Sequence, residues 1–212
     1  MADVRKWIQD LYESEWKARY DAVAALEELS RKEPQQVEPA IPKLIERLDD
    51  SYDGVWYYAA KALGNMAAVD ALEPLGQLTS GSKIWAGNTQ GQIAQEAINK
   101  IRRRALPTLL REINFHVTPE SIGHGEVATI SIEVTNTLNG VVKDLVIDLS
   151  QAEAFFELSE KVIAFPPLGK GGRFRKYVEV KPTPIGFLGE LTFEAKISSN
   201  IGERSKDFKL TV

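Results

Sequence analysis

Cysteine is absent from this 212-residue sequence, and histidine nearly so. The lack of cysteine excludes disulfide bonds, zinc–thiolate sites, iron–sulfur clusters and thiol catalysis. The two histidines stand apart in context: His116 lies in a strand-like pattern and His124 lies between two glycines. No His or Cys pair has the spacing of a metal site. We therefore predict no catalytic residue, no cofactor and no metal.

Long apolar runs and an excess of basic charge are also missing. No run approaches the ~18 apolar residues of a membrane span, and the charged start of the chain is unlike a signal peptide. The net charge is −4 at pH 7, which does not favour nucleic acid as a partner. The densest basic cluster, residues 100–104, is interpreted as a helix C-terminus, where cations are favourable. We expect a cytoplasmic protein without a membrane span.

An internal repeat dominates the first half of the chain. Residues 59–66 read Ala-x-x-Ala-Leu-x-x-Met, and similar spacings begin 37 residues earlier and 35 residues later. Positions i, i+3, i+4 and i+7 share one face of a helix, so each copy is predicted to be helical. A repeat of this period predicts about three stacked helical hairpins. The copies are Ala22, Ala25, Leu26 and Leu29; Ala59, Ala62, Leu63 and Met66; and Ala94, Ala97, Ile98 and Ile101.

Near Leu106-Pro107 the apolar period changes from 3.6 to 2, which predicts strands. Residues 127–135 alternate strictly, and Gly- and Pro-rich turns divide the remainder into seven or eight short strands. Such a run predicts a β-sandwich of immunoglobulin type. The fold class is therefore multi-domain α + β: an α-solenoid over residues 1–107 and an immunoglobulin-like β-sandwich over residues 108–212.

The N-terminal half resembles short HEAT repeats, of the kind also found in phycobilisome-lyase-like proteins. The matching residues are Asp50-Ser51, Val55, Ala59-Ala60 and Ala62-Leu63-Gly64-Asn65-Met66. Trp56 follows Val55 where the family often has arginine. The resemblance covers about residues 1–105 and implies an α-solenoid.

The C-terminal half resembles immunoglobulin-like domains of the CARDB type, which are used in adhesion and binding. The resemblance rests on strand alternation and turns in the segments 117–137, 167–172 and 180–186. A HEAT-like trunk followed by an immunoglobulin-like domain is analogous to the domain order of vesicle-coat adaptins.

Three carboxylates between predicted helices allow two interpretations. Asp49, Asp50 and Asp53 have the chemistry to hold a hard cation or to act as acid and base. Alternatively they form the turn and the helix N-cap that such a hairpin needs. We favour the turn, and an enzyme of the HEAT-like lyase or DNA-glycosylase type remains as the alternative.

Aromatic residues provide the candidate binding surface. Tyr58 and Lys61 lie in opposite phase to the apolar face of the central helix, and Tyr57 lies at its flank. Trp85 lies in a connection several residues longer than its counterpart in the preceding repeat, either as an interaction tip or as a cover for the last repeat. Tyrosine and tryptophan are frequent interface anchors. We predict that Tyr57, Tyr58, Lys61 and Trp85 bind a partner.

These patterns predict a non-enzymatic protein–protein interaction scaffold or adaptor. Binding would use the concave HEAT surface, an edge of the sandwich, or both. A self-associating structural or coat protein is a further alternative, so the oligomeric state is left open. The sequence does not identify the partner.

Overall fold

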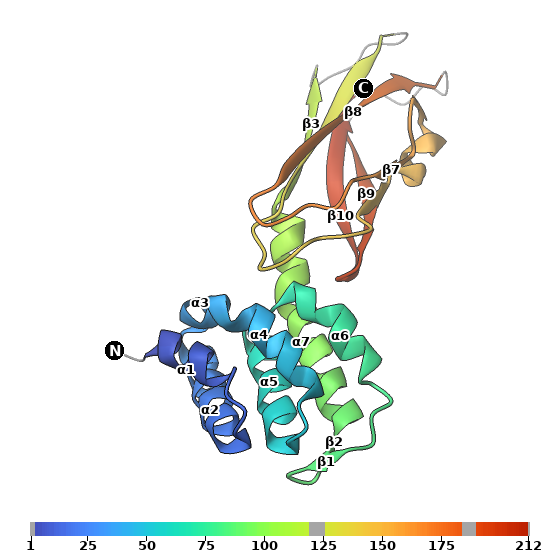
Figure 1. The fold of residues 1–212 in the computed structure, drawn as a ribbon. Helices are drawn as coiled ribbons and strands as arrows, with labels where there is room; N and C mark the ends of the chain where they lie inside the picture. The colour runs from blue at the N-terminus through green and yellow to red at the C-terminus, as the bar shows by residue number, and fades with distance from the viewer. Residues whose placement is uncertain (1–2, 119–125, 184–189, 212) are drawn as a thin grey trace. The chain divides into compact units, whose positions relative to one another are not determined.

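The structure is a computed structural model that describes residues 3–118, 126–183 and 190–211 (Figure 1). The chain divides into two compact units, Met1–Ala105 and Leu106–Val212. The first unit is almost entirely helical, and the second consists mainly of antiparallel strands. In the described residues, no helix combines the length and the apolar character needed to cross a membrane.

Each hairpin of the helical unit has a short or broken first arm and a longer second helix. Proline explains the breaks, because Pro34, Pro39, Pro42 and Pro74 each lie in the first turn of a short helix, where a missing N–H is tolerated. The first arms are α1 (Val4–Asp10); α3 (Pro34–Val37), η1 (Glu38–Ala40), α4 (Ile41–Glu46) and η2 (Arg47–Asp49); and η3 (Val69–Ala71) with α6 (Leu72–Gln77). The second helices are α2 (Trp16–Lys32), α5 (Asp53–Asn65) and α7 (Gln90–Arg111).

The repeated apolar positions form the core of this unit. All four members of the central and third copies are buried, as are Ala22 and Leu26 of the first, whereas Ala25 and Leu29 are only partly covered. Helices α5 and α7 approach closely at Gly64, where an added Cβ would lie 3.2 Å from the Cα of Ala97. The small residues of the repeat thus set how closely neighbouring helices pack.

Helix α7 is longer than predicted. We expected the helical period to end near Leu106-Pro107, but α7 continues through Pro107 to Arg111. The buried stripe of Ile101 continues at Ala105 and Leu109, with the i, i+4, i+8 spacing of one helix face. Burial along this stripe therefore outweighs the backbone hydrogen bond that Pro107 cannot donate.

The second unit contains two four-stranded antiparallel sheets in its described part. Their orders are β10-β9-β5-β7 and β3-β4-β8-β6. The strands are β3 (Ile113–Thr118), β4 (Ala128–Thr135), β5 (Val146–Asp148), β6 (Phe156–Leu158), β7 (Val162–Ala164), β8 (Arg173–Pro182), β9 (Glu190–Ser199) and β10 (Gly202–Thr211), with the 3₁₀ turn η4 (Ser150–Ala154) before β6. The predicted turn around His124 and part of the one at residues 182–186 lie outside the described residues.

Alternating burial along β4 confirms the period-two pattern, because every second side chain from Ala128 to Val134 is buried. Aromatic rings from the two sheets contact each other in this unit. Phe115 of β3 stacks on Phe208 of β10 with ring centroids 5.2 Å apart, and Phe156 of β6 meets Phe193 of β9 at 5.4 Å.

Candidate functional site

Seven aromatic side chains contact one another near the N-terminal ends of α2 and α5. Trp56 is fully buried and meets Tyr57 edge to face at 6.1 Å. We call the other six, Trp16, Tyr20, Tyr52, Tyr57, Tyr58 and Trp85, the aromatic cluster. Trp16 stacks on Tyr52 with centroids 4.1 Å apart, and Tyr52 meets Trp85 edge to face at 5.4 Å. Tyr20 touches Tyr52, Trp85 and Tyr58 at 5.7, 6.3 and 5.6 Å. Edge-to-face and stacked pairs of this kind add about 0.5–1.5 kcal/mol each beyond their buried area.

The four residues predicted from the sequence belong to one chain of contacts. Tyr58 meets Tyr57 edge to face at 5.2 Å, and the Lys61 ammonium lies 5.0 Å from the Tyr57 ring centroid. Trp85 joins this chain through Tyr20. Tyr57 is buried, whereas Tyr58, Lys61 and Trp85 are half-buried. Burial raises the pKa of the Tyr58 phenol, and a hydrogen bond with Tyr20 adds to this shift.

Sequence reasoning missed Trp16, Tyr20 and Tyr52. Trp16 is 46% exposed and is the most accessible ring of the aromatic cluster. Two signals were present in the sequence. Trp16 and Tyr20 lie four residues apart, on one face of α2, and Tyr20 precedes Tyr57 by the same 37 residues that separate the first two repeats.

A tight hairpin places Trp85 against α5. Strands β1 (Ile84–Trp85) and β2 (Asn88–Thr89) pair across Ala86 and Gly87, which have φ of 50° and 79°. Two positive φ angles in a two-residue loop are typical of a type I′ turn. The hairpin lies at the end of the helical unit where α5 begins (Figure 1). Trp85 therefore folds onto the first turn of α5, while its neighbour Ile84 is 64% exposed.

Gly54, in the first turn of α5, makes room for two rings of the aromatic cluster. A Cβ at Gly54 would lie 2.6 Å from Cε2 of Tyr20 and 2.9 Å from Cζ2 of Trp85. We expect Gly54→Ala to push both rings outward, to lower the free energy of unfolding by about 1–3 kcal/mol and to shift tryptophan emission to longer wavelength. Urea denaturation followed by fluorescence measures both effects.

The control for this substitution is Gly76→Ala in α6. Nothing lies within 4 Å of a Cβ at Gly76, so alanine there should stabilise the helix by about 0.5–1 kcal/mol. Equal effects of the two substitutions would contradict the packing described for Gly54.

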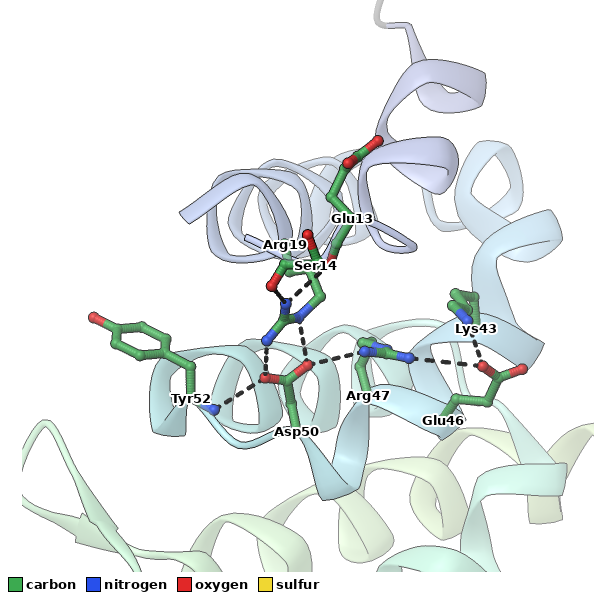
Figure 2. Close-up of polar contacts among 8 residues, drawn as sticks. All are labelled: Glu13, Ser14, Arg19, Lys43, Glu46, Arg47, Asp50 and Tyr52. Atoms are coloured by element: carbon green, nitrogen blue, oxygen red, sulfur yellow. Dashed lines mark hydrogen bonds and ion pairs between the residues drawn. The ribbon is translucent and has the colours of Figure 1, made fainter. Parts of the chain in front are cut away.

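Asp50, two residues before Tyr52, lies in a buried ion-pair network (Figure 2). Arg19 donates hydrogen bonds to both carboxylate oxygens of Asp50, from Nε to Oδ2 at 2.7 Å and from Nη2 to Oδ1 at 2.9 Å. Arg47 donates to Oδ2 at 3.1 Å, and the Tyr52 amide donates to Oδ1 at 3.0 Å. Arg19 also donates to the backbone carbonyls of Glu13 and Ser14. The network ties the start of α2 to the turn that carries Tyr52.

Of the three carboxylates weighed as a catalytic or cation site, Asp50 and Asp53 are engaged in local contacts, and Asp49 is exposed. The Asp50 oxygens accept hydrogen bonds from two arginines and an amide, and an Asp53 oxygen accepts one from the indole N–H of Trp56 at 3.0 Å. Asp50 therefore acts as a structural anchor of the turn. Helix α2 begins without a side-chain cap: Glu15 precedes it and makes no capping hydrogen bond, and the Ser14 carbonyl accepts from Arg19.

Two residues of the basic cluster at positions 100–104, Lys100 and Arg104, connect helix α7 to helix α5. Asn65 of α5 is buried and donates to Ser30 of α2 at 2.8 Å. Lys100 donates to the Asn65 side-chain oxygen, and Arg104 donates to the Asn65 backbone carbonyl. Desolvation lowers the pKa of Lys100. These two cations therefore contact α5, whereas Arg102 and Arg103 are exposed.

Comparison with known families identifies one segment of the helical unit. Residues 57–80 match the PBS lyase HEAT-like repeat. This HEAT-like repeat runs from Tyr57 within α5 through α6, and confirms the HEAT resemblance for that stretch. The match includes three of the four predicted contact residues, Tyr57, Tyr58 and Lys61. A search of curated proteins found no significant match.

Solved structures similar to this chain include two that span it differently. One is the alkylpurine DNA glycosylase AlkC of Pseudomonas fluorescens, bound to DNA that contains an abasic site analogue. Its sequence is 16% identical and its TM-score is 0.28, and the alignment covers 99% of this chain and 63% of the glycosylase chain. The other is an engineered protein: 26% identity, TM-score 0.38, covering 53% of this chain and 56% of that one. The chain thus spans less than two thirds of either structure.

Proposed function

We propose that this chain is a non-enzymatic protein-interaction module, a scaffold or adaptor, that binds a partner protein through the aromatic cluster of its helical unit. The observation that carries the proposal is the cluster itself: six contacting rings, with Trp16 46% exposed at its edge. Rigid Trp and Tyr side chains bury a large area on binding at a low entropic cost. The Asp50 network and Gly54 hold these rings in place before any partner arrives.

We also infer that the helical hairpins form a small HEAT-like solenoid and that the two sheets form an immunoglobulin-like sandwich. Support for the sandwich comes from the ring contacts between the sheets and from the strand order. The neighbours β3-β4-β8 and β10-β9-β5 correspond to strands A-B-E and G-F-C of immunoglobulin domains. A HEAT-like solenoid joined to such a domain suits an adaptor, because both folds present long binding surfaces.

Substitution of Trp16 tests the proposed function. Trp16→Ala should weaken partner binding at least tenfold, because truncating a hot-spot aromatic typically costs about 2 kcal/mol or more. The exposed position of Trp16 predicts a small loss of stability. The assay is affinity capture from native lysate with mass spectrometry. The captured protein is then titrated against the wild type and against Trp16→Ala.

The matched control is Tyr177→Ala in β8, which removes an aromatic ring that is 59% exposed on the other unit. Retained binding by Tyr177→Ala and lost binding by Trp16→Ala would support the proposal. Equal binding by wild type and Trp16→Ala would refute it. Concentration-dependent sedimentation that Trp16→Ala abolishes would instead indicate a self-associating protein.

A further inference from the structure

Strand β3 has one edge without a neighbouring strand in the described residues. It pairs with β4 on one side and ends its sheet on the other. The amide of Thr135 in β4 donates to the carbonyl of Glu112 at 3.1 Å, which places residue 112 in a hydrogen-bonded pair. Since such pairs alternate along an antiparallel ladder, residues 114, 116 and 118 also direct their backbone groups to β4. The N–H and C=O groups of Ile113, Phe115 and Val117 therefore face the open edge.

A contact of Lys206 in β10 confirms that the backbone carbonyl of Ile113 points away from β4. Its ammonium donates to the carbonyl of Ile113 and, at 2.8 Å, to that of Leu110. The Lys206 ammonium therefore occupies the hydrogen-bonding position of the edge at Ile113. Beyond Ile113, the outward N–H and C=O groups of Phe115 and Val117 have no backbone partner in the described part of the chain.

A cleft accompanies these open backbone groups. It has a volume of about 630 Å³ and lies between residues 114–117 of β3 and residues 206–209 of β10. The stacked rings of Phe115 and Phe208 line it, so it offers apolar surface beside the hydrogen-bonding edge. Its volume is in the range of specific ligand sites. Two donors and two acceptors that repeat every second residue match the backbone of one extended chain.

We propose that the open edge of β3 binds an extended segment of a partner protein as an added strand. The segment pairs its backbone with Phe115 and Val117 and seats an apolar side chain against Phe115 and Phe208. Strand addition of this kind takes its affinity from main-chain hydrogen bonds and its specificity from alternate side chains. The inference rests on the proposed role as an interaction module, but it assigns a second site, on the other unit.

Val117→Pro is the decisive variant. Proline removes the outward N–H and leaves the β4 ladder intact, because the Val117 amide does not pair with β4. Val117→Ala is the matched control, since it shortens the side chain and keeps the N–H. Circular dichroism and melting temperature establish that both variants fold before binding is measured.

The probe is a fluorescently labelled synthetic octapeptide with the sequence of β4, Ala128–Thr135, whose strict alternation of apolar and polar residues suits an added strand with one face against Phe115 and Phe208. A second copy of the peptide, N-methylated at alternate residues, keeps the side chains and loses the donors. We expect wild type and Val117→Ala to bind the plain peptide with similar affinity, Val117→Pro to bind it at least tenfold more weakly, and no chain to bind the N-methylated peptide. Binding should also slow hydrogen exchange at the amides of Phe115 and Val117.

The proposal would be overturned by no binding of the plain peptide, by equal binding of wild type and a folded Val117→Pro, or by equal binding of the N-methylated peptide. If the wild type self-associates and Val117→Pro abolishes this, the strand added at β3 comes from a second copy of this chain, and the proposal of a partner protein is wrong. Trp16→Ala should leave peptide binding unchanged, because Trp16 lies in the helical unit. Failure at β3 is thus distinguishable from failure at the aromatic cluster.

Discussion

Replacing Asp50 with asparagine is expected to lower the free energy of unfolding by about 3–5 kcal/mol. The side chain of Asp50 is 1% exposed and is paired with Arg19, whose side chain is 8% exposed, and with Arg47. Asparagine keeps the volume but removes the negative charge, so Arg19 loses the carboxylate it is paired with, and Arg47 keeps only the longer contact to Glu46, at 3.8 Å. Urea denaturation with an unchanged m-value measures the loss.

The neighbouring residue Asp49 supplies the control. Asp49 is exposed, so Asp49→Asn should change stability by no more than about 0.5 kcal/mol. A loss for Asp50→Asn as small as that of Asp49→Asn would show that the network contributes nothing net.

The same network predicts how stability depends on pH. Burial alone would raise the pKa of Asp50, but hydrogen bonds from Arg19, the Tyr52 amide and Arg47 outweigh it and hold this pKa below its ordinary value of 3.8. A lowered folded-state pKa gives stability that is complete above the ordinary value and is lost as the pH falls through the folded-state value. The stability difference between wild type and Asp50→Asn should therefore shrink as the pH falls below about 4.

Replacing Asn136 with alanine is expected to cost about 3 kcal/mol or more in the second unit. This fully buried side chain donates to the carbonyls of Gly140 and Leu168 at 2.9 and 2.7 Å, and accepts from the Leu138 amide at 2.9 Å. Alanine removes the bonds to the Leu138 amide and the Gly140 carbonyl, whereas the Leu168 carbonyl still accepts from the Val142 amide at 3.0 Å. Each buried group left unsatisfied costs about 1–3 kcal/mol. Thermal and urea denaturation of this unit measure the effect.

Asn136→Asp separates hydrogen bonding from volume. Aspartate is nearly isosteric and still accepts from Leu138, but it directs oxygen at two carbonyl oxygens, so it should destabilise at least as much as alanine. Asn114→Asp on the exposed face of β3 is the matched control, with an expected change within about 0.5 kcal/mol. Greater stability of Asn136→Asp than of Asn136→Ala would contradict the assigned donor role.

Periodicity predicted the elements well where one face of an element is buried. The repeat from Ala59 to Met66 and the alternation from Ala128 to Val134 both lie where expected, because burial of one face imposes its period on the sequence. The end of α7 was missed because proline is a strong local signal, whereas the burial of Ala105 and Leu109 is a tertiary effect.

Only part of the candidate site was predicted, because spacing within one helix groups residues, whereas contacts between helices do not show in the sequence. Tyr57, Tyr58 and Lys61 share one helix, so their spacing alone groups them. Trp85 joins them only because a hairpin folds it onto Gly54, and Tyr20 links the two groups from α2. Spacing within a helix is visible in a sequence, but a contact between helices 30 or more residues apart is not.

The order of helical hairpins followed by antiparallel strands could be read from the sequence, since the spacing of apolar residues shows which face of each element meets the core. The roles of the polar and aromatic residues, in contrast, follow from contacts between segments that are distant in the chain. Asp50 pairs with Arg19 across 31 positions, and Asn136 holds two turns together through carbonyls that carry no sequence signature. The physical reason is that burial of an apolar face repeats along the chain, whereas a hydrogen bond or a ring contact depends on where two distant segments meet.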